Sequence, residues 1–150
     1  MKRILAPILL LTLLFPTFAF GEMLGDLVYR GGLYYKKFTT VPFTGKVTGR
    51  FQGAFRNGKE HGPWVSYHEN GQLFNKGIYK NGKWEGPWVG YHDNGKLSYK
   101  RTYKDGKKHG PSVSYWKNGQ LNFKGTYKDD KTHGPWVFYN ETGKVIRKGD

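Results

Sequence analysis

The chain contains no cysteine among its 150 residues. It therefore has no disulfide bridge, no thiolate chemistry and no cysteine that could carry a lipid at an export cleavage site. Acidic residues are also few, 11 against 25 lysines and arginines, so a site built from paired carboxylates is not expected. No Ser-His-Asp set, phosphate-binding glycine loop or nucleophile motif is present. These absences predict a protein that is not an enzyme and that needs no cofactor or metal.

The chain is rich instead in aromatic side chains, which make up 17% of it, and in positive charge, with a formal net charge of +14. Disordered chains are poor in aromatics, because they do not bury enough apolar surface to fold. The 22 glycines recur with other turn residues, a composition typical of many short strands. We therefore expect one folded, β-rich and strongly basic domain.

The first 21 residues have the composition of an export signal. Lys2 and Arg3 precede an apolar stretch, Ile4–Phe20, and the small residues Ala19 and Gly21 stand two apart where it ends. This order predicts a signal peptide at residues 1–21, cleaved after Gly21, and a periplasmic or secreted mature protein. An uncleaved membrane anchor is the alternative, but the stretch contains two prolines and is short for a span of ~20 residues.

The clearest internal signal is a repeat of 24 residues without insertion or deletion. Its opening hexapeptide occurs as Gly62-Pro63-Trp64-Val65-Ser66-Tyr67, Gly86-Pro87-Trp88-Val89-Gly90-Tyr91, Gly110-Pro111-Ser112-Val113-Ser114-Tyr115 and Gly134-Pro135-Trp136-Val137-Phe138-Tyr139. Such strict spacing predicts stacked units, each of which contacts only its neighbours.

Two turn signals alternate with two short strands in each unit. Asn70-Gly71 represents the first turn and Asn81-Gly82 the second. Such pairs tolerate positive φ at both positions and favour tight hairpin turns. Each Gly-Pro is expected to mark the start of a strand, because proline has no N–H for the ladder. The fold class expected is all-β, a single-layer antiparallel β-hairpin meander, or solenoid, of 24-residue repeats.

The repeat frame divides the rest of the chain into a cap and an array. Residues 22–40 break the pattern and are expected to form an N-terminal cap. The array is expected at residues 41–150, as a partial unit 41–61, full units 62–85, 86–109 and 110–133, and a partial unit 134–150. Charged residues in the last strand are expected to protect the sheet edge from aggregation.

Side chains alternate between the two faces of a strand, so each unit is expected to have an aromatic face and a lysine face. The candidate binding residues are Trp64, Tyr67, Trp88, Tyr91, Tyr115, Trp136 and Tyr139 in an aromatic ladder, and Lys76, Lys100 and Lys124 in a lysine column. The ladder is interpreted either as core packing or as the lining of a ligand groove. The lysines form either a solvated outer face or a surface that attracts anions.

The histidines do not indicate a metal site. His61, His109 and His133 share one repeat position, and His68 and His92 share another. Equivalent positions lie ~10 Å apart, too far for one ion. They are interpreted as turn and surface residues. Basic residues interleaved with aromatics also occur in proteins that bind single-stranded nucleic acid, but an export signal argues against a specific nucleic-acid partner.

The pattern Gly-Pro-Trp-x-x-Tyr-x-x-Asn-Gly-x-Leu, followed by Gly-x-Tyr-Lys-Asn/Asp-Gly-Lys, resembles the variant MORN repeat (membrane occupation and recognition nexus). It is carried by Gly62–Lys83, Gly86–Lys107, Gly110–Lys131 and Gly134–Lys148. The resemblance implies an array of hairpins that contacts proteins or acidic phospholipids, with no shared catalytic residues. Bacterial proteins with this variant are often called YwqK-family antitoxins.

Three residues depart from the repeat: Arg101 replaces a glycine, Ser112 a tryptophan and Asp130 a turn glycine. Three functions are compatible with the sequence. The first is a non-catalytic exported scaffold that binds an unidentified protein partner. The second is electrostatic binding to an anionic membrane surface, or to lipid or glycan of the cell envelope. The third is an antitoxin or immunity protein that neutralises a toxin.

Overall fold

The computed structural model describes residues 21–149, so the predicted signal peptide lies almost wholly outside the described residues. Within this range, no helix is long and apolar enough to cross a membrane. The elements in chain order are β1 (Glu22–Met23), the 3-10 helix η1 (Leu24–Asp26), β2 (Leu27–Arg30), β3 (Leu33–Lys36), β4 (Gly45–Thr48), β5 (Phe51–Arg56), β6 (Lys59–Glu60), β7 (Gly62–Tyr67), β8 (Leu73–Lys80), β9 (Lys83–Tyr91), β10 (Leu97–Lys104), β11 (Lys107–Tyr115), β12 (Leu121–Lys128), β13 (Lys131–Tyr139) and β14 (Val145–Gly149).

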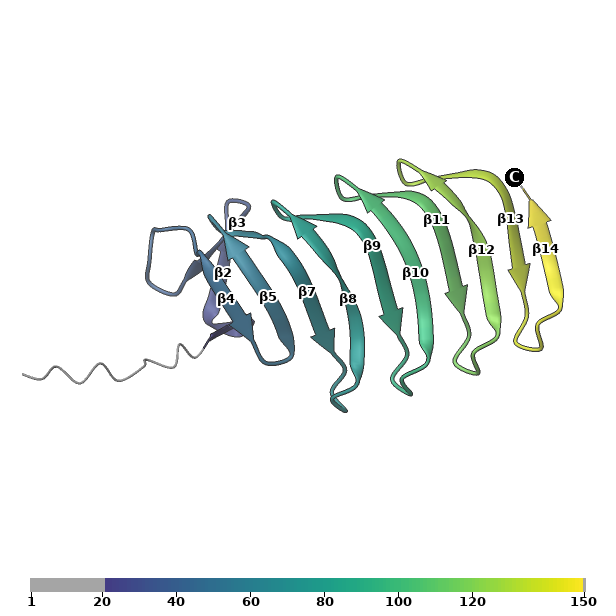
Figure 1. Ribbon diagram of the computed structural model, residues 1–150. Coiled ribbons are helices and arrows are strands. Elements are labelled where there is room, and N and C mark those ends of the chain that lie inside the picture. Colours follow the sequence, from purple (N-terminus) through teal and green to yellow (C-terminus); the bar gives the residue numbers. More distant parts are fainter. Residues whose placement is uncertain (1–20, 150) are drawn as a thin grey trace, which may run out of the picture.

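One large sheet contains the whole array. Its strand order is β1-β4-β5-β7-β8-β9-β10-β11-β12-β13-β14, with β6 paired to β5. Every pairing from β4 to β14 is antiparallel. Figure 1 shows these strands side by side in one layer. The predicted all-β hairpin meander is confirmed.

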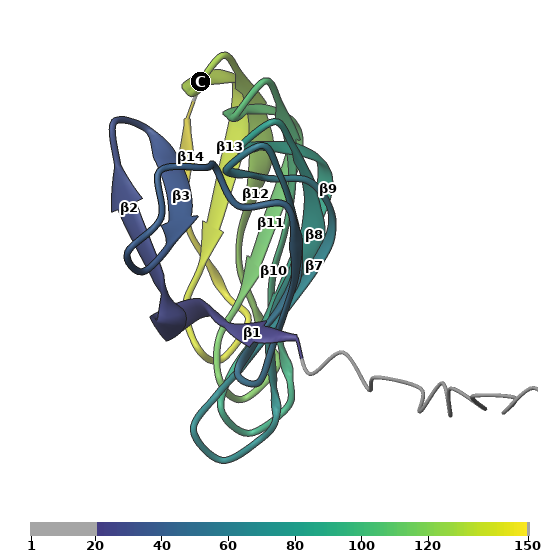
Figure 2. The ribbon, with the colours of Figure 1, turned by 90° about the vertical axis from the view of Figure 1, so that its left-hand side faces the viewer.

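A second layer exists at the N-terminal end. Strands β2 and β3 form a separate two-stranded sheet, which stands in front of one face of the large sheet (Figure 2). From this hairpin, the ring of Tyr34 packs 4.8 Å from that of Phe55, and the Tyr34 N–H donates to the Gly58 carbonyl at 2.8 Å. β1 adds to the edge of the large sheet, parallel to β4. The cap therefore covers part of a face as well as ending the array.

The second turn of each unit is as predicted. Asn81 and Gly82 both have positive φ, 53° and 79°, as a tight hairpin turn requires. The first turn differs, because only Gly71 of the Asn70-Gly71 pair has positive φ. There the His68 N–H donates to the carbonyl of Gln72 at 2.7 Å, which closes a longer loop that needs one left-handed residue. The expectation of positive φ at both positions was wrong for this turn.

The prediction that each Gly-Pro starts a strand was also wrong for the later units. Gly86 and Pro87 lie inside β9, and only Gly62 begins a strand, β7. Gly86 has a φ of 66°, and the pairing of β9 with β8 shifts register across this point. Gly86 bends β9 and interrupts its hydrogen-bond ladder with β8. Because the ladder is already interrupted there, the N–H that Pro87 lacks removes no further ladder hydrogen bond on the β8 side.

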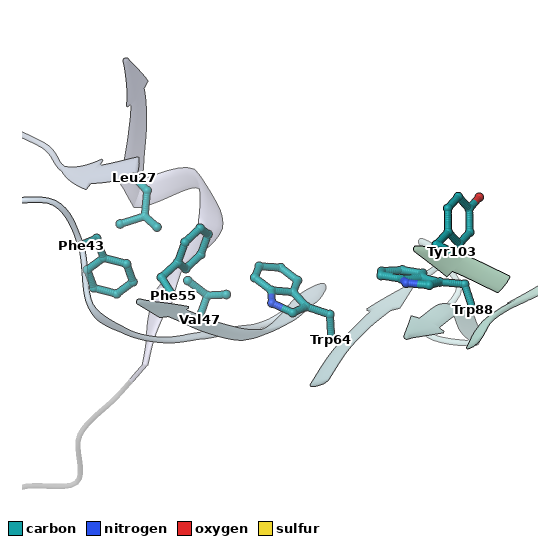
Figure 3. Packing of buried hydrophobic residues seen from close by; sticks show 7 residues of the cluster. All are labelled: Leu27, Phe43, Val47, Phe55, Trp64, Trp88 and Tyr103. Carbon is teal, nitrogen blue, oxygen red and sulfur yellow. The ribbon is translucent and has the colours of Figure 1, made fainter. Parts of the chain in front are cut away.

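The core is a row of aromatic rings along the array. Its buried residues are Leu27, Phe43, Val47, Phe55, Trp64, Trp88 and Tyr103, which Figure 3 shows in order from the cap into the repeats. The Phe55 and Trp64 ring centroids lie 5.4 Å apart, and Tyr79 lies 5.2 Å from Trp88. Edge-to-face contacts at such distances stabilise a core in addition to the area they bury. This row therefore packs the cap and the first repeat units on one another; it ends at Tyr103, and Trp136 is buried apart from it.

Each core tryptophan lies directly over a glycine that stands eleven residues earlier. A β-carbon at Gly77 would lie 2.2 Å from the Trp88 indole, and one at Gly125 would lie equally close to Trp136. This close approach explains why the repeat has glycine in the middle of a strand, where it is otherwise unfavourable.

The two departures at Arg101 and Ser112 belong to one site. Position 112 is that of the tryptophan and position 101 that of the glycine beneath it, so both members of the pair are exchanged together. The Arg101 guanidinium lies 4.6 Å from the ring centroid of Tyr99 on the same face. Ser112 is 1% exposed, and neither its hydroxyl nor Arg101 Nε has a hydrogen-bond partner. Arginine has thus replaced the indole in this unit, and it leaves two buried polar atoms unpaired.

Candidate functional site

The lysine face is one row of directly paired residues that crosses the repeats. Consecutive cross-strand partners in this row are Val65, Lys76, Val89, Lys100, Val113, Lys124, Val137 and Lys148. The lysines are exposed and the valines between them are half-buried. Equivalent lysines stand two strands apart, ~10 Å at the usual strand spacing. The predicted column of Lys76, Lys100 and Lys124 is thus present as a regular array of positive charges.

These lysines are not neutralised by neighbouring acids. The ion pairs of the described residues are Lys36–Glu22, Arg50–Glu69, His109–Asp129 and Lys117–Asp93, and none includes a lysine of this row. The lysine face therefore carries uncompensated positive charge.

The aromatic face lies on the other side of the sheet and contains the core tryptophans. Trp64, Trp88 and Trp136 are only 5–7% exposed. Each indole N–H donates to a backbone carbonyl ten residues earlier, as Trp88 Nε1 does to Ile78 at 3.1 Å. As candidate binding residues they present little surface, and their observed role is to pack the array.

The candidate tyrosines are separate from the tryptophans. Tyr67, Tyr91, Tyr115 and Tyr139 are half-buried. The ring contacts of Trp64 and Trp88 are instead with Phe55, Tyr79 and Trp84. The structure therefore does not bring the two candidate sets into one ladder.

The uncovered part of the aromatic face lies beyond the cap. The β2–β3 hairpin lies at the β4–β5 end of the array (Figure 1), so among the described residues the later strands have no second layer on this side. Half-buried aromatics line it, among them Tyr99, Phe123, Tyr127 and Phe138. Cations lie against three of these rings: Arg101 at 4.6 Å from Tyr99, Lys108 at 4.9 Å from Tyr127 and Arg147 at 4.2 Å from Phe138. This surface is both aromatic and basic.

A hollow of about 220 Å³ opens on the aromatic face where the cap ends. The residues that line it are Leu24, Tyr34, Phe51, Glu60, Trp64, Val65, Ser66, Phe74, Asn75, Tyr79, Trp84 and Trp88. Asn75 stands where the next units have Tyr99 and Phe123, so a smaller side chain leaves space in this unit. Its amide oxygen accepts a hydrogen bond from the Ser66 hydroxyl at 2.8 Å.

Glu60 is the acidic residue of this hollow, and its carboxylate is half-buried. Burial raises the pKa of Glu60 above its usual 4.5, because desolvation disfavours the charged form. Burial also raises the pKa of Tyr34 and of Tyr79, and in both cases the negative charge on Glu60 adds to the effect. The charge of Glu60 therefore acts on a tyrosine of the cap, Tyr34, and on one of the array, Tyr79, which both line the hollow.

A ladder of side-chain hydrogen bonds between units was not predicted from the sequence. His68 Nε2 donates to the Tyr91 carbonyl and His92 Nε2 to the Tyr115 carbonyl, each at 2.9 Å. At the next equivalent position, Trp116 Nε1 donates to the Tyr139 carbonyl at 3.1 Å. The histidines interpreted as surface residues thus connect neighbouring units. The alternation of His, His and Trp at one repeat position was the signal, because all three are N–H donors.

A parallel set of bonds joins the first turns. The amide groups of Asn70, Asn94 and Asn118 donate to the backbone carbonyls of Asp93, Lys117 and Glu141. Neighbouring units are therefore also joined at their first turns. Over residues 21–149, no group of three or more His, Cys, Asp or Glu side chains is placed to hold a metal ion.

A comparison with protein families finds a match to the MORN repeat variant over residues 60–81, 84–105, 108–129 and 132–150. The match spans more than half of the chain, and its four segments repeat at the 24-residue spacing. No curated protein matches the chain.

Proposed function

The chain belongs to the MORN repeat variant family, and from this we propose that it is a non-catalytic, exported scaffold that binds a protein partner through its aromatic face. Repeats of this kind are generally modules that bind proteins or lipids. Export is supported by the signal-like composition of the first 21 residues.

The observation that carries this proposal is the uncovered aromatic face. A sheet normally buries its apolar face against a second layer, and here that layer ends with the β2–β3 hairpin. Around the hollow, Phe51 and Trp84 remain 38% and 39% exposed. Aromatics and arginine are the residue types that most often dominate protein–protein contacts, and both occur together on this face.

The lysine face supports a second candidate function, electrostatic binding to anionic lipid or glycan of the envelope. The unpaired lysines recur at every second strand along the array. Binding through exposed charges of this kind weakens as salt rises, because they are screened over ~8 Å at physiological ionic strength. An immunity function against a toxin would use the protein-binding mode, and the identity of the partner distinguishes it from a general scaffold.

The experiment is affinity capture from an envelope extract with residues 22–150 as bait, washed at low and then at high salt. A stoichiometric protein retained through high salt supports the scaffold. Phe123→Ser on the aromatic face is then expected to reduce retention. Lys124→Ser, the adjacent residue on the lysine face, is the matched control and is expected to leave retention unchanged. Capture only of lipid or glycan that elutes with salt, with sensitivity to Lys124→Ser, would refute the scaffold and favour the second candidate.

A further inference from the structure

The hollow beside the cap differs from the rest of the aromatic face in the sign of its charge. Further along the face, Arg101, Lys108 and Arg147 supply cations to aromatic rings. In the hollow the charged group is instead the carboxylate of Glu60. The same position holds Trp84, Lys108 and Thr132 in the following units, so the acid is particular to this unit.

Within the described part of the chain, no cation is paired with this carboxylate. None of the ion pairs among residues 21–149 includes Glu60. Lys59 and Lys83 line a second hollow that Glu60 also borders, and the side-chain nitrogen of neither lysine lies within 4.0 Å of the carboxylate. A half-buried carboxylate without a cationic partner keeps much of its desolvation cost, which a cation from outside would offset.

The rings around Glu60 are arranged to receive such a cation. The ring centroid of Trp84 lies 5.3 Å from that of Trp88 and 6.5 Å from that of Tyr79. The three rings together form an aromatic wall of the hollow. In the described chain no Lys or Arg lies over any of these three rings. Electron-rich ring faces attract ammonium groups, and the attraction is stronger where water is excluded.

We propose that this hollow receives a lysine side chain of the partner protein, with its ammonium group at Glu60 and its alkyl chain against Trp84, Trp88 and Tyr79. Lysine fits because its four-carbon chain packs on apolar surface while its charged end reaches a polar group. The chain already contains a lysine–ring contact of this kind, because Lys108 Nζ lies 4.9 Å from the ring centroid of Tyr127. The inference rests on the proposed function, because it specifies the chemistry of the partner's contact.

The first experiment tests the hollow without the partner. Nα-acetyl-lysine methylamide is titrated into residues 22–150, and the indole N–H signal of Trp84 is followed by NMR. We expect this signal to shift, and the uncharged analogue Nα-acetyl-norleucine methylamide to bind at least tenfold more weakly. Glu60→Gln is expected to weaken binding of the lysine probe about tenfold. Glu69→Gln is the control, because it removes the same charge at an acid whose side chain is 88% exposed.

Equal shifts with the two probes, or unchanged binding by the Glu60→Gln protein, would overturn the inference. Because glutamine has nearly the same shape as glutamate, an unaltered pattern of the other indole signals shows that the variant is folded. Trp84→Leu is the second variant: it removes the ring, keeps the carboxylate and is expected to weaken the lysine probe as well.

The second experiment uses the captured partner. Acetylation of its lysines before capture, or Glu60→Gln in the bait, is expected to lower retention at least fivefold. Retention unchanged by both treatments would refute a lysine in the hollow and leave the scaffold function standing. Failure to capture any protein would refute the scaffold, whereas the probe titration would still report on the hollow itself.

Discussion

The exchange at Arg101 and Ser112 predicts a strong coupling between two positions. In three other places an indole lies over a glycine, at Gly53–Trp64, Gly77–Trp88 and Gly125–Trp136. The double variant Arg101→Gly with Ser112→Trp should restore this packing in the irregular unit. Each of the other three indoles donates its N–H to the carbonyl ten residues earlier. The new indole at position 112 is therefore expected to donate to the Thr102 carbonyl.

The magnitude follows from burial and from the unpaired polar atoms. A tryptophan buries about 150–250 Å², which at about 25 cal/mol per Å² is an upper limit of about 4–6 kcal/mol. Two costs reduce this gain. The Arg101 side chain loses its packing and its contact with Tyr99, and a new glycine inside a strand costs about 0.5–1 kcal/mol. Removal of the unpaired Ser112 hydroxyl adds to it. We expect the double variant to be about 1–2 kcal/mol more stable than the natural chain.

Each single change should destabilise the protein. Ser112→Trp places an indole where the Arg101 side chain lies, and such overpacking costs about 1–3 kcal/mol. Arg101→Gly leaves a space above Ser112. Denaturant unfolding of the four proteins gives the coupling free energy. The gain of the double variant and the losses of the two single variants add in this quantity, so we expect it to favour the pair by more than about 2 kcal/mol. Additive effects, or a double variant no more stable than either single variant, would refute the view that the two departures form one exchanged pair.

Three further predictions concern stability and are measured by the same denaturant unfolding. Gly125→Ala places a methyl group 2.2 Å from the Trp136 indole, so the free energy of unfolding should fall by about 1–3 kcal/mol; an unchanged value would contradict the close approach. His92→Leu removes a hydrogen-bond donor to the next unit and should lower the free energy of unfolding by about 1 kcal/mol. His92→Trp should lose less, because Trp116 donates at the equivalent position. Equal losses in the two variants would count against the ladder of bonds between units. The raised pKa of Glu60 means that its carboxyl contributes stability below the usual 4.5 and loses it as pH rises through the folded pKa. Glu60→Gln should therefore stabilise the chain at about pH 7 and do so less at about pH 4; a gain that is the same at both would show that desolvation of this carboxylate is not its cause.

Local pattern was sufficient to predict the array. The 24-residue period, the Asn81-Gly82 turn and strand alternation together place the lysine row and the aromatic row on opposite faces. These features depend on neighbouring residues, so the sequence carries them directly. The Gly-Pro prediction was wrong because the same pair also suits a bend inside a strand, and only the glycine φ distinguishes the two.

Features that depend on packing between distant segments were beyond the sequence pattern. The β2–β3 hairpin covers the sheet because Tyr34 packs on Phe55, a contact that no repeat spacing indicates. The hollow exists because Asn75 is smaller than its counterparts and because the cap ends beside it. No sequence motif surrounds Glu60, and its burial depends on how the cap and the array pack together.

Binding of a protein partner to the aromatic face is tested most directly by residue-level footprinting of the chain, free and bound to the captured partner. Tyr99 and Tyr127 report on the aromatic face by oxidative labelling, and Lys100 and Lys124 report on the opposite face by acetylation. We expect the partner to protect the two tyrosines and to leave the two lysines reactive. Protection of the lysines with the tyrosines unchanged would contradict it.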